Sequence, residues 1–192
     1  MPEEDRTMKY IHSTIIMCVF VFFAVSFAGP NHAAAASAAE LNRDAKNSLQ
    51  KLYAKSSSAK TLGEKAKAIL VFPNITKGGF IVGGQYGEGV LIKDGKVTGY
   101  YNTISASYGL QAGIQKYGYA LFFMTDSMLA YLDKSGGWEL GMAPNIVVVD
   151  VGAAAGISTT TAQSDAYAFF FDQKGLMAGL GLQGTKVTKI QK

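Results

Sequence analysis

The sequence has little cysteine and histidine, and this limits its chemistry. Its single cysteine, Cys18, and its two histidines, His12 and His32, all lie near the start of the 192-residue chain. The rest of the chain therefore offers no thiol nucleophile, no imidazole base, no disulfide and none of the usual zinc ligands. We predict no catalytic residue, no metal site and no cofactor.

Carboxylates and hydroxyls remain as possible catalytic groups. Glu88, Asp126, Asp150 and Asp165 could supply an acid/base pair, but their spacing in sequence says nothing without a fold. A hydrolase would use Glu88 or Asp126. The sequence also lacks any Asp-rich calcium loop. These absences favour a binding or structural role over an enzymatic one.

The N-terminal residues have the order of a secretory signal. Lys9 precedes a stretch from Ile11 to Gly29 without Asp, Glu, Lys or Arg, and an alanine-rich run from Ala33 to Ala39 follows. A basic start, an apolar middle and a small-residue end are typical of signal peptides. We predict that residues 1–38 are a signal peptide, cleaved after Ala36 or Ala38, of an exported periplasmic or envelope-associated protein.

Two details of this segment bear on its processing. Met17 stands where a lipoprotein signal needs a small residue before the modified cysteine, so lipidation of Cys18 is disfavoured. Translation starts at Met1 or at Met8, which begins a more typical basic signal. With the signal removed, residues 39–192 form one predicted domain.

The predicted domain is moderately basic. From Ala39 onward it has 16 lysines and arginines against 11 acidic residues. This excess suits an anionic surface such as a membrane. Because the sequence contains no long basic run, we do not expect a nucleic-acid partner.

Two helices are predicted before the main body of the domain. Leu41, Ala45, Leu49 and Leu52 recur at helical spacing between Glu40 and Tyr53. We expect this amphipathic helix to pack on the domain, with a membrane-surface position as the alternative. A capping box at Thr61 and Glu64 predicts a second helix through Lys65 to Ile69, which Pro73 would stop.

The stretch from Lys77 to Gly89 alternates bulky residues with glycines. It is either a phosphate-binding loop or a bent strand, since glycine suits both. A phosphate loop needs a helix after it, whereas an Asp94-Gly95 hairpin turn follows here. We therefore predict that the glycines bend a strand.

Period-2 patterns continue to the end of the chain. Predicted strands include Val97 to Ser107, Tyr108 to Gln115 and, after a short loop at Lys116, Tyr117 to Met124. A C-terminal hairpin is predicted from Tyr167 to Phe171 and Leu176 to Leu182, with its turn at Asp172 to Gly175, before a last strand from Lys186 to Ile190. With roughly eight strands in total, the predicted fold is α+β. Two N-terminal helices would pack on a large curved antiparallel β-sheet, either a partly open or a closed barrel.

Lysines stand at the predicted strand ends and turns. If several turns meet at one end of the sheet, these lysines form a basic rim for lipid phosphates. The alternative is that they keep the sheet edges soluble. The candidate lipid-binding residues are Lys77, Lys93, Lys96, Lys174, Lys186 and Lys189.

Three long segments resemble the SYLF domain. They are VFPNITKGGFIVGGQYGEGVLI from Val71, YYNTISASYGLQAGIQKYGYALFFMTD from Tyr100 and YAFFFDQKGLMAGLGLQGTKVTKI from Tyr167. The resemblance implies a lipid-binding module, with membrane and phosphoinositide binding in eukaryotic members and actin binding in some. Bacterial relatives are often described as lipid-binding or as lipoproteins. The resemblance implies no particular contact residues.

The leading hypothesis is a non-enzymatic lipid-binding module of the cell envelope. It would associate with anionic phospholipid or a membrane surface through the basic rim. The alternative is a structural or interaction protein of the envelope that holds a protein partner through sheet edges or its glycine-rich surface.

Overall fold

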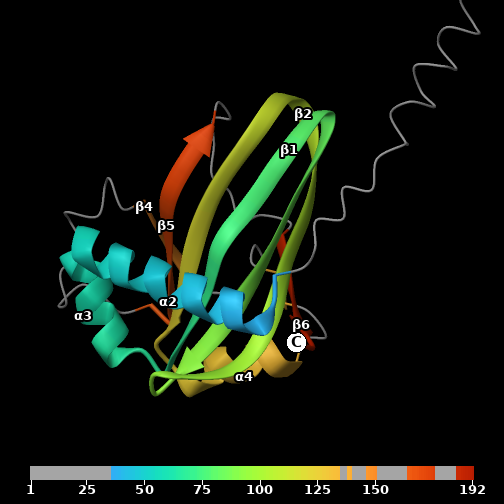
Figure 1. Ribbon diagram of the computed structural model, residues 1–192. Helices are drawn as coiled ribbons and strands as arrows, with labels where there is room; N and C mark the ends of the chain where they lie inside the picture. Colours follow the sequence, from blue (N-terminus) through green and yellow to red (C-terminus); the bar gives the residue numbers. More distant parts are fainter. Residues whose placement is uncertain (1–35, 135–137, 140–145, 151–163, 176–184) are drawn as a thin grey trace, which may run out of the picture. The chain divides into compact units, whose positions relative to one another are not determined.

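The computed structural model describes residues 36–134, 138–139, 146–150, 164–175 and 185–192 (Figure 1). All of them belong to the unit Ala36–Lys192. The predicted signal segment lies almost wholly outside these residues, and so does much of the predicted C-terminal hairpin. The described helices are α2 (Ala38–Lys55), α3 (Ser57–Lys65) and α4 (Asp126–Lys134). The strands are β1 (Ala68–Lys93), β2 (Lys96–Phe123), β3 (Trp138–Glu139), β4 (Ile146–Asp150), β5 (Ala166–Gly175) and β6 (Thr185–Ile190).

A long hairpin of β1 and β2 forms the centre of the fold. The strands have 26 and 28 residues and are joined at Asp94-Gly95, where both residues have positive φ, as a tight hairpin turn requires. They pair from Lys93 and Lys96 to Ala68 and Phe123. The prediction of two separate strands in residues 108–124 was wrong, because Lys116 continues one strand instead of forming a loop.

This hairpin folds back on itself. The register shifts between Phe80, which pairs with Ala112, and Val82, which pairs with Tyr108. Figure 1 shows both strands rising to an arch and descending again. We call residues 68–80 and 112–123 the first half of the hairpin, and residues 82–108 the second half.

Two glycines let the halves approach each other closely. A Cβ on Gly87 would lie 2.6 Å from Ile75 Cγ1 and 2.9 Å from the carbonyl oxygen of Asn74. A Cβ on Gly89 would lie 2.5 Å from the ring of Phe72. Glycine is therefore needed where β1 passes against its own first part. The prediction of a bent glycine-rich strand is confirmed.

The other strands extend the two halves in opposite directions. β5 pairs antiparallel with β2 in the first half, and β4 lies parallel to β5. β6 pairs antiparallel with β2 in the second half, and β3 pairs with β6. The sheet is therefore mixed rather than wholly antiparallel. Among the described residues it ends at β3 and β4, so it is partly open and the closed-barrel alternative is wrong.

The first predicted helix is confirmed as α2. Ser37 caps it, because its side chain accepts a hydrogen bond from the amide of Glu40 while the Glu40 carboxylate accepts one from the Ser37 amide. Its residues Leu41, Ala45 and Leu52 are buried. Helical periodicity was sufficient to find it.

The second predicted helix was displaced. α3 begins after Ser56, whose hydroxyl accepts from the amide of Ala59, whereas the Thr61 hydroxyl donates to a carbonyl inside the helix. The chain is already extended at Ala66. Pro73 stops no helix and instead lies in β1 at a register shift between Phe72 and Ile75, a position that tolerates a missing N–H.

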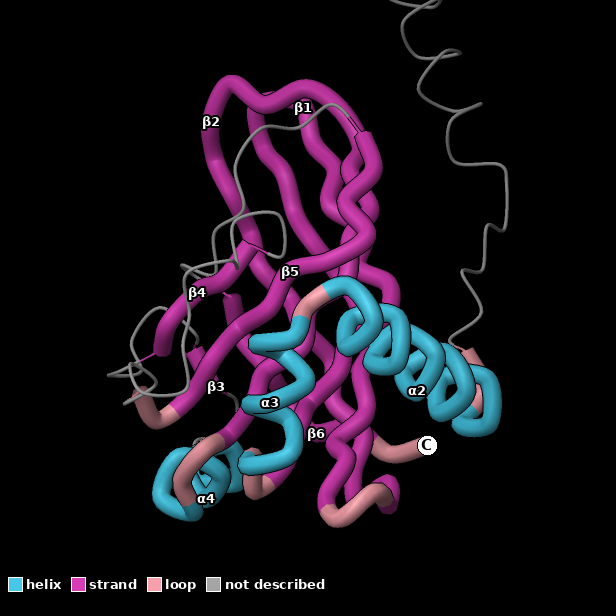
Figure 2. The backbone as a smooth tube through the Cα atoms, turned by 90° about the vertical axis from the view of Figure 1, so that its left-hand side faces the viewer, coloured by secondary structure: helices cyan, strands magenta, loops and turns pink. Residues whose placement is uncertain are grey.

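Alternation along the strands creates two faces, each with its own core. The inner face lies between the two halves of the hairpin and contains Leu70, Phe72, Tyr119 and Leu121, together with Met128 of α4. The outer face carries an equally buried layer beneath α2 and α3, formed by residues such as Val71, Val90, Ala120, Phe122 and Phe169. Figure 2 shows α2 and α3 over the sheet and α4 at its lower end. The outer core includes Leu41, Ala45 and Leu52 and so holds α2 against the outer face.

Candidate functional site

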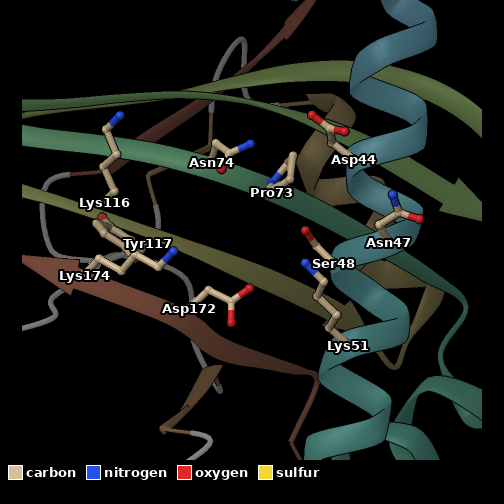
Figure 3. A pocket seen from close by; sticks show the side chains of 10 residues that line it. All are labelled: Asp44, Asn47, Ser48, Lys51, Pro73, Asn74, Lys116, Tyr117, Asp172 and Lys174. Carbon is tan, nitrogen blue, oxygen red and sulfur yellow. The ribbon is translucent and has the colours of Figure 1, made fainter.

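A pocket of about 290 Å³ lies on the outer face, between α2 and the first half of the hairpin (Figure 3). Its walls come from four elements that are distant in sequence. Helix α2 contributes Asp44, Asn47, Ser48 and Lys51, β1 contributes Pro73 and Asn74, β2 contributes Lys116 and Tyr117, and β5 contributes Asp172 and Lys174. Three lysines therefore border one small cavity, which we call the basic pocket.

The sheet register brings two of these lysines together. Lys116 and Lys174 are directly opposite each other on neighbouring strands, and both line the basic pocket. Like charges directly opposite in an antiparallel pair destabilise the sheet. An anion bound between them would remove this repulsion.

A bulge at Asp172 produces that register. The pairing shifts so that Gly118 faces Phe171 while Lys116 faces Lys174. Asp172 has a φ of 52°, a left-handed conformation that aspartate adopts more readily than most residues. The predicted turn at Asp172 to Gly175 is therefore a bulge within β5, and it places Lys174 beside Lys116.

Asp172 also organises the charges around the pocket. Lys55 Nζ donates to its carboxylate at 2.7 Å, and the two side chains are 55% and 35% exposed. This hydrogen bond lowers the pKa of Asp172, and the charges of Lys55, Lys51 and Lys174 lower it further. Lys55 therefore pairs with Asp172 from outside the set of residues that line the pocket.

The pocket has a second carboxylate on its helical wall. Asp44 lies on α2, across from the sheet that carries Lys116 and Lys174 (Figure 3). Its carboxylate contacts the neighbouring Arg43 at 3.2 Å, in a pair whose side chains are 66% and 38% exposed. Such exposed pairs are weak. The sheet wall of the basic pocket thus carries Lys116, Lys174 and the Asp172 that pairs with Lys55, and its helical wall carries Asp44 and Lys51.

The structure places the six predicted lysines at several positions. Lys174 lines the basic pocket. Lys77 lies three residues from the bend, opposite the buried Gln115. Lys93 and Lys96 lie beside the hairpin turn. Lys186 and Lys189 lie on β6, opposite Ile104 and Tyr101 of β2. The structure thus brings Lys174 together with Lys51 and Lys116, and the lipid-binding role of the six remains a prediction.

Sequence reasoning missed Lys51 and Lys116. Lys51 is a polar residue of an amphipathic helix, and Lys116 was assigned to a loop. A strand continuing through Lys116 would have placed it on the face opposite Tyr117. No local signal shows that β5 brings Lys174 beside it.

Neither a membrane-spanning helix nor a metal cluster appears in the described part of the chain. No helix there is long and apolar enough to cross a membrane. The same residues contain no group of three or more His, Cys, Asp or Glu side chains that could hold a metal ion.

Comparison with known proteins gives one family match. Residues 104–192 match the model of the family Ysc84, described as "Las17-binding protein actin regulator". No curated protein matches the chain. The matched residues include Lys116, Asp172 and Lys174 of the basic pocket, whereas its α2 wall precedes them.

Proposed function

We propose that this chain binds membranes containing anionic phospholipid. The premise is that residues 104–192 belong to the SYLF (Ysc84) family of binding modules. The basic pocket is the proposed headgroup site. No catalytic step is part of this function. The observation that carries the proposal is the pair Lys116 and Lys174, which are directly opposed and border the same cavity as Lys51.

Electrostatics support this assignment. Each lysine near an anionic bilayer contributes about 1 kcal/mol to binding. The Asp172 carboxylate would oppose an incoming phosphate, but its hydrogen bond with Lys55 offsets this. The sheet wall of the pocket therefore attracts a phosphate more strongly than lysines scattered over a surface would.

The size of the pocket and an exposed neighbour suggest how a lipid would lie. A volume of about 290 Å³ is at the small end for ligand sites and suits a headgroup rather than acyl chains. Ile114 is 66% exposed and lies two residues before Lys116 on the same face of β2. An apolar side chain beside a basic site is typical of surfaces that rest on lipid.

The proposed location is the cell envelope, reached by export. Its support is the apolar segment from Ile11 to Gly29 with Lys9 before it and an alanine-rich run after it. N-terminal sequencing of the protein recovered from the envelope tests this location. A chain that keeps Met1 or Met8 and stays in the cytosol would contradict it.

Sedimentation with vesicles tests the membrane function. The full chain should sediment with anionic but not neutral vesicles, and less strongly as the salt concentration rises. The double variant Lys116→Gln with Lys174→Gln should bind roughly 30-fold more weakly, from a loss of about 2 kcal/mol. The matched control changes Lys60 and Lys65, exposed residues of α3, to glutamine. Equal binding to both kinds of vesicle, or equal loss in both variants, would reject the proposal.

Strand β4 favours a second candidate, the binding of a protein partner. It lies at one end of the described sheet, and Val147 and Val148 are 37% and 53% exposed. Open, apolar strand edges accept a further strand. Under this alternative, crosslinking in cells captures one abundant partner, Val148→Lys abolishes the capture, and vesicle binding is absent.

A further inference from the structure

The basic pocket holds a carboxylate, Asp44, across from the opposed lysines Lys116 and Lys174, and this arrangement carries information about its ligand. We propose that it selects an aminophospholipid headgroup, in which a phosphate is joined to a primary ammonium group. The inference rests on the proposed headgroup site and names the chemistry of its occupant. Phosphoethanolamine and phosphoserine both contain this pair of groups.

The phosphate belongs at the sheet wall. Lys116 and Lys174 are direct partners in the register of β2 and β5, so no carboxylate separates them there. Lys51 reaches the same cavity from α2. Lysine ammonium groups bind phosphate as point charges, so three of them around one cavity form a suitable anion site.

The ammonium group belongs at the helical wall. The two pocket carboxylates differ in their contacts, because Asp172 accepts a 2.7 Å hydrogen bond from Lys55 whereas Asp44 accepts a longer one, 3.2 Å, from the neighbouring Arg43. Arg43 is 66% exposed, and exposed ion pairs are weak, so a cation of the ligand can compete with it for Asp44. Asp44 is therefore the carboxylate that can receive a cation from the ligand.

The neighbours of Asp44 suit the same end of the ligand. Asn47 and Ser48 line the helical wall beside it and offer amide and hydroxyl groups that accept hydrogen bonds. An ammonium group has three donors. A phosphate with an uncharged glycerol would use the lysines but would leave Asp44 without a cation, so the pocket should distinguish the two.

Soluble headgroups test this directly by isothermal titration calorimetry on the full chain. We expect O-phosphoethanolamine to bind about threefold to fivefold more tightly than glycerol 3-phosphate, as one exposed ion pair allows. O-phosphoserine and inorganic phosphate complete the series. A preference for both amino compounds identifies the ammonium group, while a preference for phosphoethanolamine alone shows that the serine carboxylate is repelled by Asp44.

Asp44→Asn is the decisive variant, because it keeps the shape of the side chain and removes its charge. It should abolish the preference for amino headgroups without weakening glycerol 3-phosphate binding. Glu64→Gln, on the exposed surface of α3, is the matched control and should keep the preference.

The results separate this inference from the function on which it rests. If all phosphates bind equally and still depend on Lys116 and Lys174, the headgroup site stands and the amino selectivity is rejected. A preference that survives Asp44→Asn also rejects it. If no phosphate compound binds in the pocket, both proposals fail.

Discussion

Polar side chains are arranged differently on the two faces of the same strands. On the inner face, Tyr117 donates to Gln85 Oε1 at 2.6 Å, and Gln85 donates to Thr185 at 3.1 Å. On the outer face, the preceding residue in sequence, Lys116, lies opposite Lys174 with the same charge. The inner groups form hydrogen bonds with one another, whereas the outer groups repel one another.

This difference separates a structural role from a binding role. A buried polar group destabilises the fold unless it has a partner. The inner residues largely meet that requirement, since the Tyr119 hydroxyl also donates to Thr103 at 2.9 Å. Charges left unmatched at a surface attract a ligand instead. We therefore expect inner substitutions to change stability and pocket substitutions to change binding.

The largest effect should come from Gly87→Ala, which disturbs both faces. The added Cβ would lie 2.6 Å from Ile75 Cγ1 and 2.9 Å from the carbonyl oxygen of Asn74, a residue of the pocket wall. We expect a loss of about 3 kcal/mol in the free energy of unfolding, because backbone must move. Urea unfolding measures it, and vesicle sedimentation should show weaker binding.

Gly84→Ala is the control on the same strand. A Cβ there would meet the carbonyl oxygen of Ser105 at 3.4 Å, an ordinary contact. The substitution should change stability by less than about 1 kcal/mol. Equal stability of the two variants would mean that the close approach of the halves of β1 does not restrict residue 87.

A smaller effect, confined to stability, is expected for Tyr119→Phe. The ring remains in the inner core, but Thr103, which is fully buried, loses the hydroxyl that donates to it. The expected cost is about 1–2 kcal/mol in urea unfolding. Vesicle binding should not change, because Tyr119 does not line the basic pocket. A loss of binding with unchanged stability would reverse the roles assigned to the two faces.

The same variant has a defined pH dependence. Burial raises the pKa of Tyr119 well above its usual value near 10. Above pH 10 the unfolded chain loses the tyrosine proton while the folded chain keeps it, so the stability of the wild-type protein falls as the pH rises. Phenylalanine lacks this titration. The difference in the free energy of unfolding between the wild-type protein and Tyr119→Phe should therefore narrow between pH 8 and pH 11.

Some of the fold could be predicted because the relevant signals are local. The 3.6-residue period of Leu41, Ala45 and Leu52 located α2, and the Asp94-Gly95 turn located the hairpin. The bend near Phe80 could not be placed, because it depends on Gly87 and Gly89 passing close to residues earlier in β1. Such contacts between distant parts of a strand leave no periodic signal.

The candidate site was less predictable for a related reason. Lys174 was selected because it was assigned to a turn, but it lies in a strand beyond a bulge. Its position beside Lys116 depends on the left-handed conformation of Asp172 and on the pairing of β2 with β5. The third lysine, Lys51, comes from a helix packed on the other side of the cavity. One local backbone conformation and two tertiary relationships therefore build the site.

The smallest expected effect comes from Lys55→Ala, which changes the charge balance without replacing a residue that lines the pocket. Without Lys55, the Asp172 carboxylate would attract Lys51 and Lys174 and compete with a phosphate for them. Glycerol 3-phosphate affinity should fall about twofold to fivefold, measured by calorimetry, while stability near neutral pH changes by less than about 1 kcal/mol. An unchanged affinity would show that Asp172 does not oppose the ligand.

The second substitution Asp172→Asn distinguishes this competition from the loss of a positive charge. If Asp172 competes with phosphate, adding Asp172→Asn to the Lys55→Ala variant should restore the affinity, whereas a general charge effect would leave the affinity low.

The lowered pKa of Asp172 also predicts how the stability of the fold depends on pH. The Lys55 pair stabilises the folded chain above about pH 4 and loses this effect as the pH falls through the lower pKa of the folded state. Wild-type stability should therefore decline more steeply in acid than that of Lys55→Ala.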